Sequence, residues 1–118
     1  MPEIHGDALR GHLEALILSA LRRGEAHGFE ILRRLEAAGS GALRLKEGSL
    51  YPALYRMESA RLIQGAWESR SLAAASARRG PRRRVYQLTS KGRARLQQAR
   101  QEFDHFVTVI GGILGATP

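Results

Sequence analysis

Apolar side chains recur every three or four residues over two stretches near the start of the chain, the spacing of helices with one buried face. The first stretch predicts a helix over residues 7–23, with Asp7 as its N-cap. The second predicts a helix over residues 27–38. The side chains expected on its buried side are Phe29, Ile31, Leu32 and Leu35.

A third, shorter helix is predicted over residues 49–60. Proline is tolerated in the first turn of a helix but not in its interior, so Pro52 places the expected start near Ser49. At 100° per residue the helix has two distinct faces. The buried face would hold Leu50, Ala53, Leu54 and Met57, and the outer face Ser49, Pro52, Tyr55, Arg56 and Ser59.

The apolar period then changes to that of strands. Residues 62–68 and 84–89 each predict a strand, and the segment between them is rich in Ser, Ala and Arg, with a turn at Gly80-Pro81. The expected structure is a long two-stranded hairpin.

The last predicted helix starts at Thr89 or Ser90 and runs to about Leu114. Its apolar positions step alternately by three and four residues, which makes a heptad stripe. The stripe consists of Leu96, Ala99, Phe103, Phe106, Ile110 and Ile113, broadened by Val107 and Leu114.

This order of elements predicts a mostly α fold with a small β-hairpin: a winged helix-turn-helix domain followed by a long C-terminal helix. We expect the DNA-binding domain in residues 1–89 and a dimerisation helix in residues 90–118, packed with the first helix. The 118 residues suit a single small unit, and the chain has no cysteine, which excludes disulfides and thiolate metal sites. Without a membrane-length apolar run or a signal-peptide pattern, we expect a cytoplasmic protein with no membrane contact.

Positive charge is concentrated in one part of the chain. Residues 61–100 hold 11 Lys and Arg but only Glu68 as an acid, a net charge of +10, whereas residues 1–60 are neutral and residues 101–118 carry −2. A local field of this sign indicates a polyanionic partner, and we expect double-stranded DNA.

Two segments are candidates for contact with that DNA. The outer face of the third helix would enter the major groove with Lys46 beside a phosphate, although a surface helix with amphipathic tyrosines at its rim is the alternative. The hairpin tip would grip phosphates through its arginines, although a solvated basic loop is the alternative and charge alone does not exclude RNA. The predicted DNA-binding residues are Lys46, Ser49, Tyr51, Pro52, Tyr55, Arg56, Arg78, Arg79, Arg82 and Arg83.

The apolar stripe of the last helix must be buried by other apolar surface, because a helix of this length extends past a three-helix core. The stripe could be intramolecular core, but a second copy of the chain is the more economical cover. The predicted dimerisation residues are Leu96, Phe103, Phe106, Val107, Ile110 and Ile113.

Signals for catalysis are poor. The four histidines show no metal-binding spacing, and no acid pair sits at the end of a strand, so we expect neither an enzyme nor a cofactor or metal. Trp67 is expected to pack in the core or at the base of the wing, with stacking on a ligand as the alternative.

Several motifs together resemble those of PadR-type transcriptional regulators. Residues Gly48-Ser49-Leu50-Tyr51-Pro52-Ala53-Leu54 resemble that family's recognition helix. His27-Gly28-Phe29 resembles the start of its second helix, and Tyr86-Gln87-Leu88-Thr89-Ser90-Lys91-Gly92 the junction of its second wing strand and last helix. The family often has glycine where Ala60 or Arg61 stands here, so the turn into the wing is expected to differ.

The resemblance implies a winged helix, a dimer built through the last and first helices, and a repressor relieved by a small molecule. We therefore interpret the chain as a homodimeric, sequence-specific DNA-binding regulator of a pseudo-palindromic operator. The alternative is a basic architectural or RNA-associated protein without sequence preference.

Overall fold

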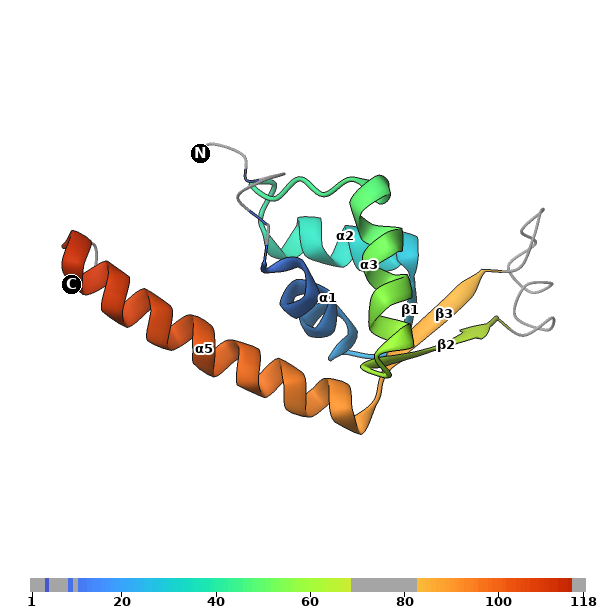
Figure 1. Cartoon of the computed structure of the whole chain (residues 1–118). Coiled ribbons are helices and arrows are strands. Elements are labelled where there is room, and N and C mark those ends of the chain that lie inside the picture. Colours follow the sequence, from blue (N-terminus) through green and yellow to red (C-terminus); the bar gives the residue numbers. More distant parts are fainter. Residues whose placement is uncertain (1–3, 5–8, 10, 69–82, 116–118) are drawn as a thin grey trace.

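The computed structural model describes residues 4, 9, 11–68 and 83–115. Three of the predicted DNA-binding arginines, Arg78, Arg79 and Arg82, lie outside the described residues, as does Asp7. The chain order is α1 (Leu13–Leu21), β1 (Ala26–His27), α2 (Gly28–Ala38), α3 (Glu47–Ser59), β2 (Ile63–Trp67), β3 (Arg84–Leu88) and α5 (Ser90–Leu114) (Figure 1). The predicted fold class, a winged helix with a long C-terminal helix, is confirmed.

Two helices begin elsewhere than the sequence predicts. α1 begins at Leu13 with His12 at its N-cap, because the preceding segment makes a turn in which the His12 N–H donates to the Leu9 carbonyl (2.9 Å). α3 begins at Glu47, which makes Pro52 an interior residue. The proline is tolerated because the carbonyl it leaves unpaired belongs to Gly48, which is exposed to water.

The strands form one antiparallel sheet in the order β1-β3-β2, with Gly65 opposite Tyr86 and Ala26 opposite Tyr86 on its other side. Both strands of the predicted hairpin are present. The short β1 was not predicted, because two residues are too few to show an alternating pattern. Through β1, the start of α2 is hydrogen-bonded to the wing.

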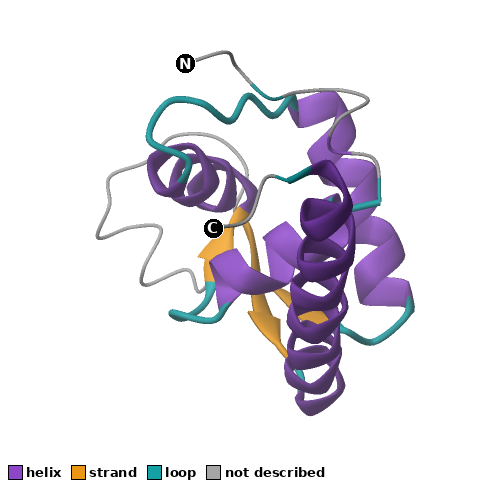
Figure 2. Ribbon diagram, turned by 90° about the vertical axis from the view of Figure 1, so that its left-hand side faces the viewer, coloured by secondary structure: helices purple, strands orange, loops and turns teal. Residues whose placement is uncertain are grey.

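The core lies where the three short helices meet the sheet. Its largest fully buried side chains are Ile17, Leu18, Ile31, Leu50, Leu54 and Ile63. The predicted inner face of α3 is buried as expected, but Phe29 is not part of the core: its side chain is 46% exposed in the first turn of α2. α5 leaves this body and extends alone toward its C-terminus (Figure 1), and it lies in front of the other elements in the view of Figure 2.

α3 ends in a Schellman motif. The Leu62 N–H donates to the Met57 carbonyl (3.0 Å) and the Arg61 N–H to the Glu58 carbonyl (3.0 Å), and Arg61 has a φ of 63°. A left-handed conformation favours glycine, which has no Cβ atom to strain the backbone. Arg61 adopts this conformation although it carries a Cβ atom.

We expect an Arg61→Gly variant to be more stable than the native chain. A non-glycine residue with positive φ is strained by roughly 1–2 kcal/mol, and part of that gain is lost to the greater freedom of glycine in the unfolded chain, so the net increase should be about 0.5–1 kcal/mol. Urea unfolding measures it. Ala60→Gly is the matched control, because Ala60 has a φ of −81° and should lose stability instead; equal effects at both positions would contradict the explanation.

Candidate nucleic-acid interface

The outer face of α3 is open to solvent. Ser49, Pro52, Tyr55 and Arg56 are all exposed, Tyr55 by 75%. Within the described part of the chain Arg56 has no ion-pair partner, and the carboxylate of Glu58, two residues further along α3, is bound to Arg84. Lys46 is exposed at the N-cap of the helix. The face therefore offers hydroxyl groups, aromatic edges and an uncommitted guanidinium to a partner.

Tyr51 has a second role that its position on α3 alone does not indicate. Its ring lies directly over Gly28, where a Cβ atom would stand 2.7 Å from the tyrosine Cε1 and Oη atoms. Tyr51 therefore packs α3 against the start of α2 while 43% of it stays exposed. The glycine after His27 is required by this close approach.

Arg84 joins the wing to α3. Its guanidinium forms an ion pair with the Glu58 carboxylate, donates to the Gly65 carbonyl (3.3 Å) and lies 5.4 Å from the centre of the Trp67 ring. The hydrogen bond with Glu58 raises the pKa of Arg84. Trp67 is 58% exposed, so it packs at the base of the wing and not in the core.

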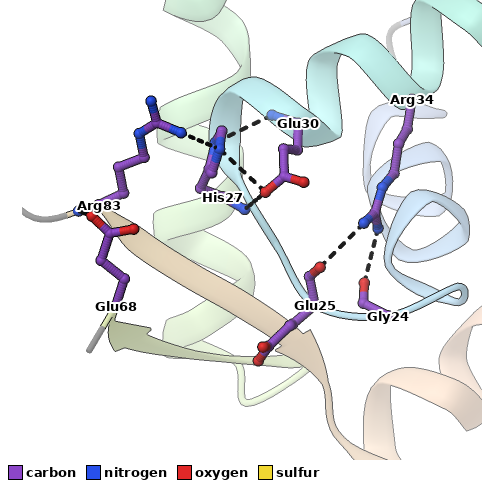
Figure 3. A network of polar contacts seen from close by, with 7 residues as sticks. All are labelled: Gly24, Glu25, His27, Glu30, Arg34, Glu68 and Arg83. Carbon is purple, nitrogen blue, oxygen red and sulfur yellow. Dashed lines mark hydrogen bonds and ion pairs between the residues drawn. The ribbon is translucent and has the colours of Figure 1, made fainter. Parts of the chain in front are cut away.

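His27 connects the start of α2 to the wing root, by which we mean residues 67–68 and 83–84. Its Nδ1 accepts from the Glu30 N–H (3.3 Å), and the Glu30 carboxylate accepts from the His27 N–H (3.3 Å), which completes a capping box. The His27 Nε2 lies 2.6 Å from Nη1 of Arg83 (Figure 3). The Arg83 N–H donates to the Glu68 carboxylate (3.1 Å), so the start of β3 is held on both sides.

A separate arginine fixes the other end of β1. Arg34 of α2 donates to the carbonyls of Gly24 (2.9 Å) and Glu25 (3.2 Å), as Figure 3 shows. It also donates to the carbonyl of Ala20 (3.0 Å), so it joins α2 to the end of α1 and the turn that follows. A guanidinium can satisfy several carbonyls at once because it has five donors. The short strand and the start of α2 are thereby held in place relative to α1.

A cleft of about 420 Å³ lies between the start of α2 and the wing root. Burial raises the pKa of Tyr86 at its base. No carboxylate is among the described residues that line it. The lining includes the aromatic residues Phe29, Tyr51 and Tyr86 and the cations Arg33, Arg83 and Arg84.

The comparison with known proteins decides the family. A model of the family described as "Transcriptional regulator PadR-like family" matches residues 17–98, which is more than half of the chain. The chain belongs to this family. The regulator is thus a DNA-binding transcription regulator of the winged-helix type, and its relatives are regulators and not enzymes.

Solved structures support the same assignment. A transcriptional regulator from Clostridium thermocellum is 27% identical, with a TM-score of 0.78 and coverage of 92% of this chain and 96% of that one. A PadR-like regulator from Bacillus cereus is 32% identical, with a TM-score of 0.73 and coverage of 92% and 97%. A PadR family regulator from Clostridium difficile is also 32% identical, with a TM-score of 0.70 and coverage of 88% and 99%.

The long helix of this PadR-family chain has two parts. Leu96 is 7% exposed and packs in the core of the protomer, which leaves little of its surface for a second copy. Next to it, Arg95 pairs with Glu14 of α1 (2.9 Å), and further along the helix the Phe103 ring stands edge-on to His12 (5.9 Å). The remaining predicted seam residues are exposed.

The outer face of α3 and Arg83 are thus both exposed to a partner, as the sequence predicts. Two further residues lie near them that the sequence did not assign to this surface. Phe29 and Arg33 lie in the first turns of α2 beside the cleft, and sequence reasoning assigned the first to the core and the second to no role. No described helix is long and apolar enough to cross a membrane. Among the described residues, no group of three His, Asp or Glu could hold a metal ion.

Proposed function

We propose that this regulator represses transcription as a homodimer that binds a pseudo-palindromic operator and is released by a small-molecule effector. The exposed apolar surface of α5 supports the homodimer, because a second copy would cover it. Repression and release rest on the resemblance to PadR-type regulators. The α3 face and the basic wing support binding in the major groove with phosphate contacts alongside.

The observation with most weight is the uncovered stripe on the second half of α5. Five of the six predicted seam residues are exposed in the protomer, and Ile113 is 76% exposed. Contiguous apolar surface of this kind marks an interaction site in soluble proteins. These residues are Phe103, Phe106, Val107, Ile110 and Ile113.

A dimer also explains how one short helix per protomer could select an operator. Two α3 helices related by a two-fold axis would enter successive major grooves roughly 34–36 Å apart. The net charge of +10 in residues 61–100 would add phosphate contacts from both wings.

Selection of binding sites from a random pool of DNA duplexes tests this proposal. We expect a pseudo-palindrome that the native protein binds at least about a thousandfold more tightly than unrelated DNA at the same salt concentration. Placed over a reporter promoter, that site should lower expression when the regulator is produced. Equal binding to all duplexes, or tighter binding to RNA, would instead support a basic architectural or RNA-associated protein.

Arg56 is the best candidate for reading a base. It is exposed on the outer face of α3, and a bidentate arginine–guanine pair contributes about 1–3 kcal/mol of discrimination. We expect Arg56→Ala to relax the preference at one base pair of each half-site. Binding to a panel of single-base variants of the selected operator measures this. A uniform loss over all variants would make Arg56 a phosphate contact instead.

A further inference from the structure

We propose that the cleft between the start of α2 and the wing root binds one phosphate of the DNA backbone, with Arg33 and Arg83 as its ligands. The proposal rests on the proposed function, since it extends the DNA footprint beyond α3 and the wing tip. It assigns a role to Phe29 and Arg33, which the core and the outer face of α3 leave unexplained.

The first observation is the arrangement of Phe29 and Arg33 on the surface of α2. The guanidinium of Arg33 lies 5.6 Å from the centre of the Phe29 ring, one helical turn away. Within the described residues Arg33 has no carboxylate partner. An exposed ring therefore supports a cation whose charge is not neutralised, and both line the same cleft.

The second observation is that His27 cannot keep its capping box and also accept a hydrogen bond from Arg83. A neutral imidazole has one donor and one acceptor nitrogen. The capping box uses Nδ1 as the acceptor, which places the proton on Nε2. That N–H has an acceptor in the Glu30 carboxylate (3.2 Å), so Nε2 offers no acceptor to the Nη1 donor of Arg83 at 2.6 Å. The other tautomer would accept from Arg83 but lose the cap. The Arg83 contact and the capping box therefore compete.

An anion resolves this conflict. A phosphate oxygen in the cleft would accept from Arg83, while His27 keeps both its cap and its contact with the Glu30 carboxylate. Arg84 lines the cleft too, but Glu58 already neutralises it, so the net charge available to a ligand comes from Arg33 and Arg83.

The position of the cleft favours DNA as the source of that phosphate. Tyr51 lines the cleft and also belongs to α3, next to the exposed face that would enter the major groove. A backbone phosphate flanking that groove would thus lie beside the cleft, and the Phe29 ring would contact the adjoining deoxyribose. Charge complementarity is clear, because the described lining has cations and no carboxylate.

The test uses full-length Arg33→Ala and Arg83→Ala variants and the selected operator, with Arg22→Ala as the control because Arg22 is exposed and does not line the cleft. Each cleft variant should bind the operator at least about tenfold more weakly at low salt. The loss of affinity should be the same for every single-base variant of the operator. The slope of log K against log salt should become shallower by about 2 units, one contact for each protomer. Arg22→Ala should behave as the native chain, and thermal melting should show all three variants folded.

A second arm locates the phosphate. In this arm, each operator has one neutral methylphosphonate per half-site, placed at a different backbone position in each operator. At one position the native protein should bind more weakly than to unmodified DNA, whereas the Arg33→Ala variant should bind both operators equally well. Cleft variants with the native salt slope, or the absence of such a position, would overturn the inference. Failure of the native protein to prefer any operator would instead overturn the proposed function, so the two outcomes are distinct.

Discussion

A Phe106→Asp variant is expected to sediment as a folded monomer. Phe106 is 56% exposed in the protomer, so the substitution should leave the fold of a single chain intact. In a dimer seam it would instead bury an unpaired carboxylate from each copy, and leaving a charge without a partner costs about 3–5 kcal/mol. The dimer dissociation constant should rise by about a thousandfold or more.

The same variant should lose tight binding to the operator. A monomer engages one half-site, and the advantage of binding two linked half-sites together is about 10²–10⁴-fold in affinity. Sedimentation equilibrium and operator titration at one salt concentration measure the two effects on the same sample.

Gln101→Asp is the matched control, because Gln101 lies on the face of α5 opposite the stripe and is also exposed. It should stay dimeric with native affinity for the operator. A Phe106→Asp protein that remains a full-affinity dimer would remove α5 from the interface, and the exposed stripe would then need another partner.

Local patterns in the sequence predicted most of the fold. The start of α5 is an example: Thr89 was one of two expected starting residues, and its hydroxyl accepts from the Gly92 N–H (2.9 Å). The inner face of α3 followed from helical spacing alone. The start of α3 did not, because the tolerance of an interior Pro52 depends on whether Gly48 can reach water, and that is a property of the folded chain.

The functional surface was less accessible to this reasoning. The outer face of α3 could be projected from 100° per residue, and the exposure of Tyr55 and Arg56 agrees with it. Phe29, however, has the same spacing as a core residue, because a sequence pattern does not reveal which part of a helix its neighbours leave uncovered. Leu96 shows the reverse case, since a heptad stripe is the same whether α1 or a second protomer covers it.

Gly92 is the position where a single methyl group should do the greatest damage to the fold. It is the third residue of α5, where the helix passes over the turn that follows α3. A Cβ atom there would lie 2.0 Å from the Leu62 carbonyl oxygen and 3.0 Å from its carbon. That carbonyl is fixed, because it accepts from the Thr89 N–H (3.2 Å) and the Thr89 hydroxyl (3.0 Å). Neither group can move without opening the contact between α5 and the end of α3.

We therefore expect Gly92→Ala to lower the free energy of unfolding by about 3 kcal/mol or more, at the upper end of the range for overpacked sites. The sign is informative, because the same change in an open helical position should raise stability by about 0.5–1 kcal/mol. Gly48→Ala in α3 is that control, since a Cβ atom at Gly48 would meet nothing within 4 Å. Urea unfolding of both variants decides the matter: a Gly92→Ala protein as stable as Gly48→Ala would mean that α5 does not pack on the Leu62 carbonyl. The glycine shared with the family's Tyr-x-Leu-Thr-x-x-Gly motif would then need a reason other than this close approach.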